Sequence, residues 1–270
     1  ISNKKILNYY GKLDKNYEII EIPYNENDIK AGQVTKEAGE FSFQSLKLAC
    51  ELKPKAIVTA PVAKNALHLA GHNFNGQTEV LQHFLAHDNQ LAEMLFVANG
   101  FRVLLLTRHC ALKEITLTQD VVVTKIKNLV KTFQKQFSIN NPKFALCGFN
   151  PHSGEDGILG REEIDILIPA VQELQNAGID ITMPLPADTL FVDAAKNYLK
   201  NTKDKYDCYI ANYHDQGLIP IKTVAGENTV NMTIGLDIVR TSPGHGTAFD
   251  IAGKNIASPN GMIAAIKEVL

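Results

Sequence analysis

The stretch EMLFVANGFRVLLLT, residues 93–107, constrains the fold of this chain more strongly than any other. Two apolar runs flank Asn99-Gly100, a residue pair that favours the tight turn of an antiparallel hairpin. Elsewhere strand patterns alternate with helical patterns, as they do in α/β folds. Together these signals predict a mixed α/β sheet that is not purely parallel.

Apolar periodicity and capping residues place the other expected elements. Short apolar runs predict strands over residues 55–62, 143–149, 207–213 and 229–235. Apolar residues at helical spacing predict helices over residues 34–52, 78–88, 118–137, 162–178 and 260–270. Thr35 and Thr118 are the expected N-caps, and Gly178 suits a helix C-terminus.

The composition is that of an ordinary soluble globular protein. The chain has 270 residues, 45% of them hydrophobic, and a net charge of −2, so nothing favours nucleic acid or an acidic membrane as a partner. No apolar stretch approaches the ~20 residues of a membrane span, and no signal peptide is visible. The four cysteines form no CxxC pair, which predicts buried, reduced thiols in a cytoplasmic protein. The chain begins ISNKK without methionine or an opening strand, and we expect part of the N-terminal segment to lie outside this sequence.

Three histidines each follow an expected strand. They are His109, His152 and His214. Ligands in α/β folds collect beyond the carboxyl ends of strands, and three neutral imidazoles with open positions form a catalytic site for a divalent ion. The histidines lie 43 and 62 positions apart, so no local motif joins them. From spacing alone, ordinary surface or hydrogen-bonded histidines remain the alternative.

Two further histidine pairs have the i, i+4 spacing of one helix face. They are His68 with His72 and His83 with His87. The pattern HExxH is absent, because phenylalanine follows His83, and Gly71 is expected to end the first helix. Packing or solvated roles are therefore expected for these four side chains.

Candidates for binding an anion are scattered along the chain. Thr78 offers its hydroxyl and backbone amides at an expected helix N-terminus, where phosphate is favoured. Lys222 and Arg240 supply positive charge and Asn231 is a neutral partner, although each alone is equally an ordinary surface residue. The chain has neither GxGxxG nor a Walker A motif, so a Rossmann-type nucleotide site is not supported.

Taken together, the ordered motifs resemble a known family. TAPVAKNAL, GQTE, TRH, NPHSGEDG, EEID, PLPADTLF, YHDQGL, VNMTIGL and VRTSPGHGTAFDIAG resemble the 4-hydroxythreonine-4-phosphate dehydrogenases of pyridoxal phosphate biosynthesis. The last motif is also similar to the adenosine-contacting loop of isopropylmalate and isocitrate dehydrogenases. The resemblance implies a two-domain fold of mixed α/β sheets of that superfamily's type. Residues 1–75 plus 230–270 would form one domain, and residues 76–229 a central metal-binding and dimerisation domain, with the active site in the interdomain cleft at a dimer interface.

The resemblance also implies site residues. The metal ligands map to His109, His152 and His214, contributed by one or both copies of a homodimer. Substrate contacts map to Gln77, Thr78, Lys222, Asn231 and Arg240. Cofactor contacts map to His245, Gly246, Thr247 and Asp250, by superfamily analogy. The implied cofactors are NAD or NADP and one divalent ion, with zinc, magnesium and cobalt all open and three imidazoles favouring a transition metal.

The implied reaction is NAD-dependent oxidation and decarboxylation of 4-phosphooxy-L-threonine to 3-amino-2-oxopropyl phosphate. The proton acceptor stays open between Asp215 and Lys222, with Asp188 a weaker candidate. Two departures from the family stand out: Gln77 occupies the place of its usual histidine, and its N-terminal glycine-rich segment is not matched.

Three alternatives therefore stay open. The first is a paralogue acting on 4-phosphoerythronate or 4-phosphothreonate. The second is a metal-dependent hydrolase with Glu155 or Asp215 as its base. The third is a ligand-binding homologue without turnover.

Overall fold

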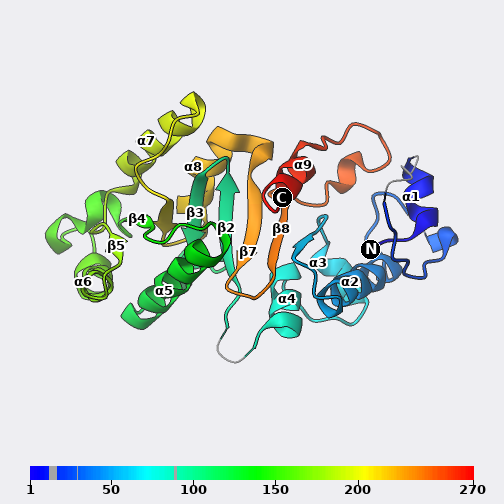
Figure 1. Cartoon of the computed structure of the whole chain (residues 1–270), viewed down its shortest axis with the longest axis horizontal. Coiled ribbons are helices and arrows are strands. Elements are labelled where there is room, and N and C mark those ends of the chain that lie inside the picture. The colour runs from blue at the N-terminus through cyan, green and yellow to red at the C-terminus, as the bar shows by residue number, and fades with distance from the viewer. Residues whose placement is uncertain (12–16, 29, 88–89) are drawn as a thin grey trace. The chain divides into compact units, whose positions relative to one another are not determined.

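The computed structural model describes residues 1–11, 17–28, 30–87 and 90–270 (Figure 1). Its contacts divide the chain into two compact units. One unit combines residues 1–92 with residues 236–270 and therefore holds both chain ends, and the other comprises residues 93–235. We call them the terminal unit and the central unit.

The central unit is built on strands in the order β7-β2-β3-β6-β4-β5. Their bounds are β2 Glu93–Ala98, β3 Phe101–Leu105, β4 Lys143–Leu146, β5 Asp180–Ile181, β6 Cys208–Ala211 and β7 Val230–Ile234. Strand β2 is antiparallel to both β3 and β7, whereas β3, β6, β4 and β5 run parallel. The prediction of a mixed sheet is confirmed.

The predicted hairpin joins β2 and β3. Asn99 and Gly100 have φ of 44° and 86°, the left-handed conformations that a two-residue hairpin turn requires. The register pairs Ala98 with Phe101. The residue types at the turn thus set which side chains of the two strands lie opposite one another.

Four helices accompany these strands: α5 Gln119–Gln136, α6 Ile168–Asn176, α7 Ala187–Lys200 and α8 His214–Ala225. Thr118 caps α5 as predicted, accepting a hydrogen bond from the backbone N–H of Val121 at 3.3 Å. Helices α7 and α8 are not predicted. Gly217 and Pro220 inside α8 are helix breakers in isolation, and the packing of α8 on β3 and β6 overrides that preference.

Alternate residues of β4 face different helices. Phe144 contacts Phe133 of α5 edge-to-face at 5.5 Å between ring centroids. Ala145 belongs instead to the core cluster that includes Phe191 of α7 and Leu218 of α8. The two faces of the sheet are therefore both covered, as the continuous burial of β2 and β6 requires.

The segment 162–178 is helical as predicted, but its helix is not α-helical throughout. Residues Glu163–Leu167 form a π-helical turn, and α6 begins only at Ile168. Pro169 follows this π-helical turn directly and has no N–H to donate to a carbonyl of the preceding turn. Gly178 lies just beyond this helix with φ of 82°.

The terminal unit contains the parallel pair β1 Ala56–Val58 and β8 Val239–Pro243, with Ala56 opposite Val239. Its helices are α1 Lys4–Tyr10, α2 Lys36–Glu51, α3 Lys64–Leu69, α4 Gln77–Leu85 and α9 Asn260–Lys267. Thr35 caps α2 as predicted. A Cβ at Gly39 of α2 would lie 1.9 Å from the carbonyl oxygen of Ala66, so only glycine allows α2 and α3 to approach this closely.

All four cysteines are free, and three are buried as predicted. The prediction of a buried thiol is wrong for Cys110, which is exposed. The chain leaves the sheet at the end of β3 and turns before Cys110. Within the residues that the structure describes, none of the helices is both long and apolar enough to span a membrane.

Candidate active site

The three candidate metal ligands follow three adjacent parallel strands. His109 comes after β3, His214 after β6 and His152 after β4, and β6 lies between the other two strands. Because the carboxyl ends of parallel strands meet at one edge of a sheet, the three segments that carry these histidines all leave the sheet at the same edge.

His109 and His214 lie side by side. Their ring centroids are 5.4 Å apart, and both line a cavity of about 410 Å³ together with Arg108, Tyr213 and Asp215. His214 Nδ1 donates a hydrogen bond to Asp215 Oδ1 at 2.7 Å. A carboxylate bound to one imidazole nitrogen fixes the tautomer and leaves the lone pair of Nε2 as the metal-ligating atom.

Helix α8 presents His214 because of close packing behind it. A Cβ at Gly217 would lie 2.6 Å from Leu105 Cδ2 and 2.9 Å from Ala211 Cβ. The first turn of α8 thus rests directly on β3 and β6. Glycine at this position holds His214, the first residue of the helix, at the edge of the sheet.

Gln216 ties together the ends of β4 and β6. Its Nε2 donates to the carbonyl oxygen of Gly148 at 2.7 Å, and its Oε1 accepts from the backbone N–H of Asn212 at 2.8 Å. Asn212 is fully buried and donates to the carbonyl oxygen of Cys147 at 2.9 Å. The glutamine of the YHDQG motif therefore has a structural role that the sequence did not reveal.

His152 lies in an unusual backbone turn. Residues 152–156 all have positive φ, between 44° and 83°, although only Gly154 is a glycine. Each other residue in this left-handed conformation costs roughly 1–2 kcal/mol. Such a turn persists only where its surroundings hold it, and strained backbone of this kind is concentrated at functional sites.

Glu163 supplies the support for this turn. Its side chain is 2% exposed; Oε1 accepts from the backbone N–H of Asn150 at 2.7 Å and Oε2 from Asn150 Nδ2 at 2.9 Å. A Cβ at Gly154 would lie 2.8 Å from Glu163 Oε2, so the carboxylate fills the space beneath the turn. The side chain of His152 is 68% exposed, with its Nδ1 3.4 Å from Glu155 Oε1.

One copy of the chain brings together only two of the three histidines. Among the residues that the structure describes, no three His, Cys, Asp or Glu side chains converge in a group that could hold a metal ion. The pair His109 and His214 fits an ion nonetheless. With ligating nitrogens about 2.0–2.1 Å from an ion, two imidazole centres at a tetrahedral angle are about 5 Å apart, close to the observed separation.

Among the described residues of the terminal unit, Arg240 is the most deeply buried charge. It lies on β8, is 3% exposed, and donates from Nε and Nη2 to Thr59 Oγ1 at 2.9 and 2.7 Å. Burial lowers the pKa of Arg240 to about 10, which leaves the guanidinium charged at neutral pH. A buried cation of this kind attracts an anionic ligand.

Gln77 and Thr78 open helix α4 in the same unit. Gln77 Nε2 donates to the carbonyl oxygen of Ala60 at 3.0 Å, and its Oε1 is buried without a hydrogen-bond partner. The carbonyl of Ala60 therefore fixes the amide orientation and leaves Oε1 as an acceptor. Thr78 is 6% exposed. Of the other candidates, Asn231 lies on β7 with a buried, unpartnered Oδ1, and Lys222 lies in the last turn of α8.

The candidate cofactor loop lines a second cavity, of about 780 Å³, in the terminal unit. His245, Gly246 and Thr247 are among its lining residues, whereas Asp250 lies in the adjacent turn of 3-10 helix outside the lining. His245 Nδ1 donates to the carbonyl oxygen of Gly246 at 2.9 Å. A Cβ at Gly261 of α9 would lie 3.0 Å from the ring of His245, so glycine makes room for that ring.

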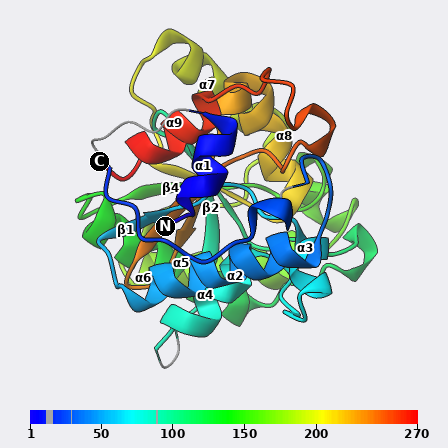
Figure 2. The same ribbon diagram turned by 90° about the vertical axis from the view of Figure 1, so that its right-hand side faces the viewer.

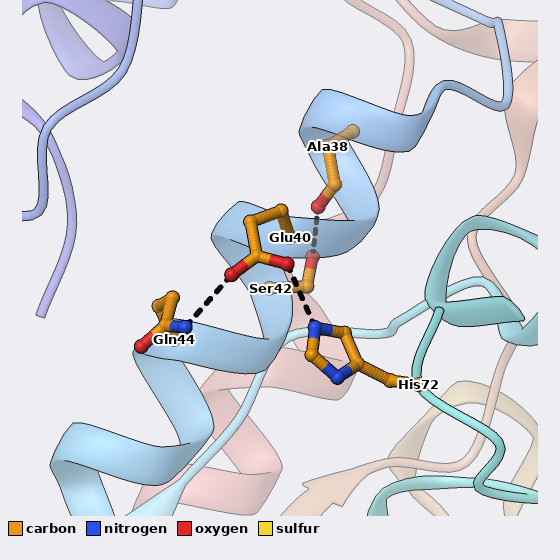
Figure 3. Close-up of polar contacts among 5 residues, drawn as sticks. All are labelled: Ala38, Glu40, Ser42, Gln44 and His72. Atoms are coloured by element: carbon orange, nitrogen blue, oxygen red, sulfur yellow. Dashed lines mark hydrogen bonds and ion pairs between the residues drawn. The ribbon is translucent and has the colours of Figure 1, made fainter. Parts of the chain in front are cut away.

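His68 and His72 have the roles expected for them: His72 is packed, and His68 is exposed. His72 Nε2 lies 2.7 Å from Glu40 Oε2 (Figure 3). The His72 ring stacks on Phe43 at 3.5 Å between centroids. His68 Nε2 lies 3.1 Å from the carbonyl oxygen of Phe74. Hydrogen bonds from Gln44 and His72 lower the pKa of the Glu40 carboxyl.

Comparison with known proteins decides the family. A family model described as pyridoxal phosphate biosynthetic protein PdxA matches residues 2–269. This chain belongs to the PdxA family. The resemblance inferred from the ordered motifs is thereby confirmed.

Individual relatives agree with this membership of the PdxA family. The chain is 44% identical over 216 residues to a 4-hydroxythreonine-4-phosphate dehydrogenase of Bradyrhizobium diazoefficiens, covering 78% of this chain and 61% of that relative. It is 40% identical to the D-threonate 4-phosphate dehydrogenase of Salmonella typhimurium, covering 88% of this chain and 72% of that protein. The crystal structure of a 4-hydroxythreonine-4-phosphate dehydrogenase from Klebsiella pneumoniae superposes with a TM-score of 0.79 at 35% identity, covering 93% of this chain and 76% of that one.

Several residues that shape this PdxA-family site escape sequence reasoning. Gln216 and Glu163 lie inside recognised motifs, but their partners are distant in sequence, so nothing local signals their roles. Thr59 lies in TAPVAKNAL and meets Arg240 across 181 positions. Only the β1–β8 pairing brings these two side chains together.

Proposed function

We propose that this protein is an NAD-dependent, metal-assisted 4-hydroxythreonine-4-phosphate dehydrogenase of pyridoxal phosphate biosynthesis, acting in the cytoplasm. Its substrate would be 4-phosphooxy-L-threonine and its product 3-amino-2-oxopropyl phosphate. The observation that carries the proposal is the pairing of His109 with an Asp215-oriented His214 at the carboxyl edge of the parallel strands. Family membership supplies the substrate class.

The third metal ligand in this proposal is His152 of the partner subunit of a homodimer. His152 is exposed on a turn that Glu163 holds rigidly, and no third ligand joins His109 and His214 within one copy of the described chain. A bound divalent ion would polarise the substrate hydroxyl and stabilise the negative charge left by decarboxylation.

The remaining residues bind and orient the substrate. Arg240 would hold the phosphate through its fixed charge, with the Thr78 hydroxyl and the amides at the start of α4 as neutral donors. The family resemblance assigns Lys222 and Asn231, both in the central unit, to substrate binding as well. Its deeply buried position makes Arg240 the strongest of these contacts, because a desolvated guanidinium gains most from an anionic partner.

The oxidation needs a proton acceptor and a hydride acceptor. The carbinol carbon would give its hydride to the nicotinamide, and the hydroxyl proton would go to Asp215 Oδ2 or Lys222 Nζ. Carbon dioxide then leaves, and the electron pair of the broken carbon–carbon bond takes a proton to complete the amino ketone. Asp215 already binds His214 through Oδ1, so only its other oxygen is available for this step. Asp188, in the first turn of α7, is the weaker candidate.

A second candidate function is oxidation of a phosphorylated sugar acid such as 4-phosphothreonate. The comparable identity to the Salmonella D-threonate 4-phosphate dehydrogenase favours it. The acceptor oxygen of Gln77 also favours this candidate. Its Oε1 can accept a hydrogen bond from a hydroxyl group of a ligand as well as from an ammonium group.

The test is turnover of the three phosphorylated acids with NAD+ and each of zinc, magnesium and cobalt, followed by NADH absorbance. We expect the highest kcat/KM with 4-phosphooxy-L-threonine and its loss in His109→Ala. Higher kcat/KM with 4-phosphoerythronate or 4-phosphothreonate would favour the second candidate. Phosphatase or amidase turnover without any NADH would instead support a hydrolase with Glu155 or Asp215 as its base.

A further inference from the structure

Tyr9 is an aromatic side chain that the proposed mechanism leaves unused. It belongs to helix α1, which is labelled in Figure 1 and Figure 2. Tyr9 is 65% exposed and lines the 780 Å³ cavity that the loop from His245 to Gly253 also lines. We propose that Tyr9 is an aromatic wall of the subsite for the adenine of the nicotinamide cofactor. This inference rests on the proposed function.

The position of Tyr9 is fixed by the start of its helix. Asn3 is 6% exposed; its Oδ1 accepts from the backbone N–H of Lys5 at 2.9 Å and caps α1. Its Nδ2 donates to the carbonyl oxygen of Ile22 at 2.8 Å, and Lys4 pairs with Glu21 at 3.0 Å. These contacts anchor α1 on the segment around residues 20–22, so the ring of Tyr9 is presented by an anchored element.

The facing wall is a tightly turned loop. A Cβ at Gly32 would lie 2.9 Å from the carbonyl oxygen of Phe249, so the chain around Ala31 approaches the loop closely. Ala248 has φ of 49°, a left-handed conformation that is uncommon for alanine. Backbone held in such conformations is concentrated at ligand-binding segments.

The chemistry of the lining favours an uncharged aromatic ligand. Tyr9 and Phe249 offer ring surfaces, Ala248 and Ile251 are apolar, and Thr247 and Asn255 offer hydrogen-bonding groups. Among the lining residues that the structure describes, none is Asp, Glu, Lys or Arg. A phosphate or a cationic nicotinamide ring would find no countercharge there, whereas adenine can stack on a ring and bond through its edge.

The experiment measures nucleotide affinity rather than turnover. NADH, AMP and nicotinamide mononucleotide are titrated by calorimetry into the wild-type chain and into Tyr9→Ala, Tyr9→Leu and Tyr9→Phe. The matched control is Tyr17→Ala, because Tyr17 is 71% exposed and does not line the cavity. Circular dichroism shows that each variant is folded.

Removal of a base-stacking ring costs about 1–3 kcal/mol, so Tyr9→Ala and Tyr9→Leu should raise the Kd for NADH and AMP about 5-fold to 150-fold. Tyr9→Phe and Tyr17→Ala should stay within about twofold, and the Kd for nicotinamide mononucleotide should not change. Wild-type affinity for AMP in folded Tyr9→Ala, with NADH still bound, overturns the role of Tyr9 and leaves the cofactor assignment standing. A wild-type chain that binds neither NADH nor AMP overturns both.

Discussion

At the scale of single residues, the site depends on a few polar side chains whose orientation is fixed by a neighbour. Asp215 orients His214, Thr59 holds Arg240, and the carbonyl of Ala60 orients Gln77. For His214 and Gln77 the partner also determines which atom of the side chain remains for a ligand. The chemistry of these positions is therefore set by their neighbours as much as by residue type.

Gln77 gives a direct prediction, on the expectation that a histidine usually occupies its place in the family. Gln77→His should lower the KM for 4-phosphooxy-L-threonine about tenfold. It replaces the acceptor oxygen of Gln77 by an imidazole N–H that can donate to the phosphate, and such a bond from a charged donor gains roughly 1–2 kcal/mol. Initial rates across substrate concentrations measure this. Gln77→Met, which removes the polar atoms at similar length, serves as the control and should raise the KM. An unchanged or raised KM in Gln77→His would show that Gln77 is no handicap at the phosphate subsite.

Glu40 gives a prediction about acid stability. Its pKa is lowered in the folded protein, chiefly by the hydrogen bond from Gln44 and then by that from His72 (Figure 3). Because the pKa of Glu40 is lower in the folded protein, its ionised carboxylate stabilises the fold at pH values above the unfolded pKa of 4.5. This stabilisation is lost as the pH falls through the pKa of the folded state. The difference in unfolding free energy between wild type and Glu40→Gln should therefore shrink below pH 4.5.

Urea titrations over that pH range measure the effect. Gln44→Ala removes the largest cause of the shift and should weaken the same pH dependence. A difference between wild type and Glu40→Gln that is constant from neutral pH through the acid range would contradict this account.

At the scale of elements, two of the proposed metal ligands lie on elements that follow strands of the central unit, helix α8 and a left-handed turn. Helix α8 begins with His214 and packs on β3 and β6 through Gly217, and the left-handed turn carries His152 over buried Glu163. Both arrangements rely on glycine or strained backbone. Substitutions there should damage the metal site without touching a ligand.

Gly217→Ala tests the first arrangement. The new methyl group would lie within 2.9 Å of three side chains, those of Leu105, Val103 and Ala211. Overpacking of this kind costs about 1–3 kcal/mol and should shift α8 outward, so metal affinity should fall together with stability. Thr223→Ala, on the exposed face of the same helix, should change neither quantity. Unchanged metal affinity in Gly217→Ala would show that the packing of α8 at Gly217 does not fix the position of His214.

Glu163→Ala tests the second arrangement. It removes the two Glu163 oxygens that accept from the backbone N–H and the Nδ2 of Asn150 beneath a left-handed turn, which should cost about 2–3 kcal/mol of unfolding free energy. Chemical denaturation measures this loss. The matched control is Glu162→Ala, which removes only the single contact from Asn150 to Glu162 and should cost less. Equal losses in the two variants would contradict the special role of Glu163.

Sequence reasoning captured elements that are determined locally. The Asn99-Gly100 hairpin and the threonine caps of α2 and α5 depend on neighbours within a few residues, and all are present. Helix α8 was missed because its glycine and proline oppose a helix until the sheet is beneath them. Strand β8 was missed because buried Arg240 interrupts its apolar pattern, and the partner that allows this burial, Thr59, is 181 positions away.

At the scale of the whole molecule, the central claim is that each metal site takes ligands from two copies of the chain. His109 and His214 lie together at the ends of adjacent strands, and His152 is exposed on its rigid turn. A homodimer in which these surfaces face each other would contain two equivalent sites. The sequence named the three histidines through the family resemblance, but it contains no information on which copy supplies each ligand.

The most direct measurement uses a doubly tagged heterodimer of His109→Ala with His152→Ala. If ligands are shared as proposed, one of its two sites keeps His109 and His214 from one copy and His152 from the other. Elemental analysis should then find about half of the wild-type metal content, with NADH production to match. A heterodimer of His109→Ala with His214→Ala has no intact site, so it should show neither metal binding nor NADH production above that of the homodimeric variants. If the first heterodimer binds no more metal than either homodimeric variant, the shared site is contradicted.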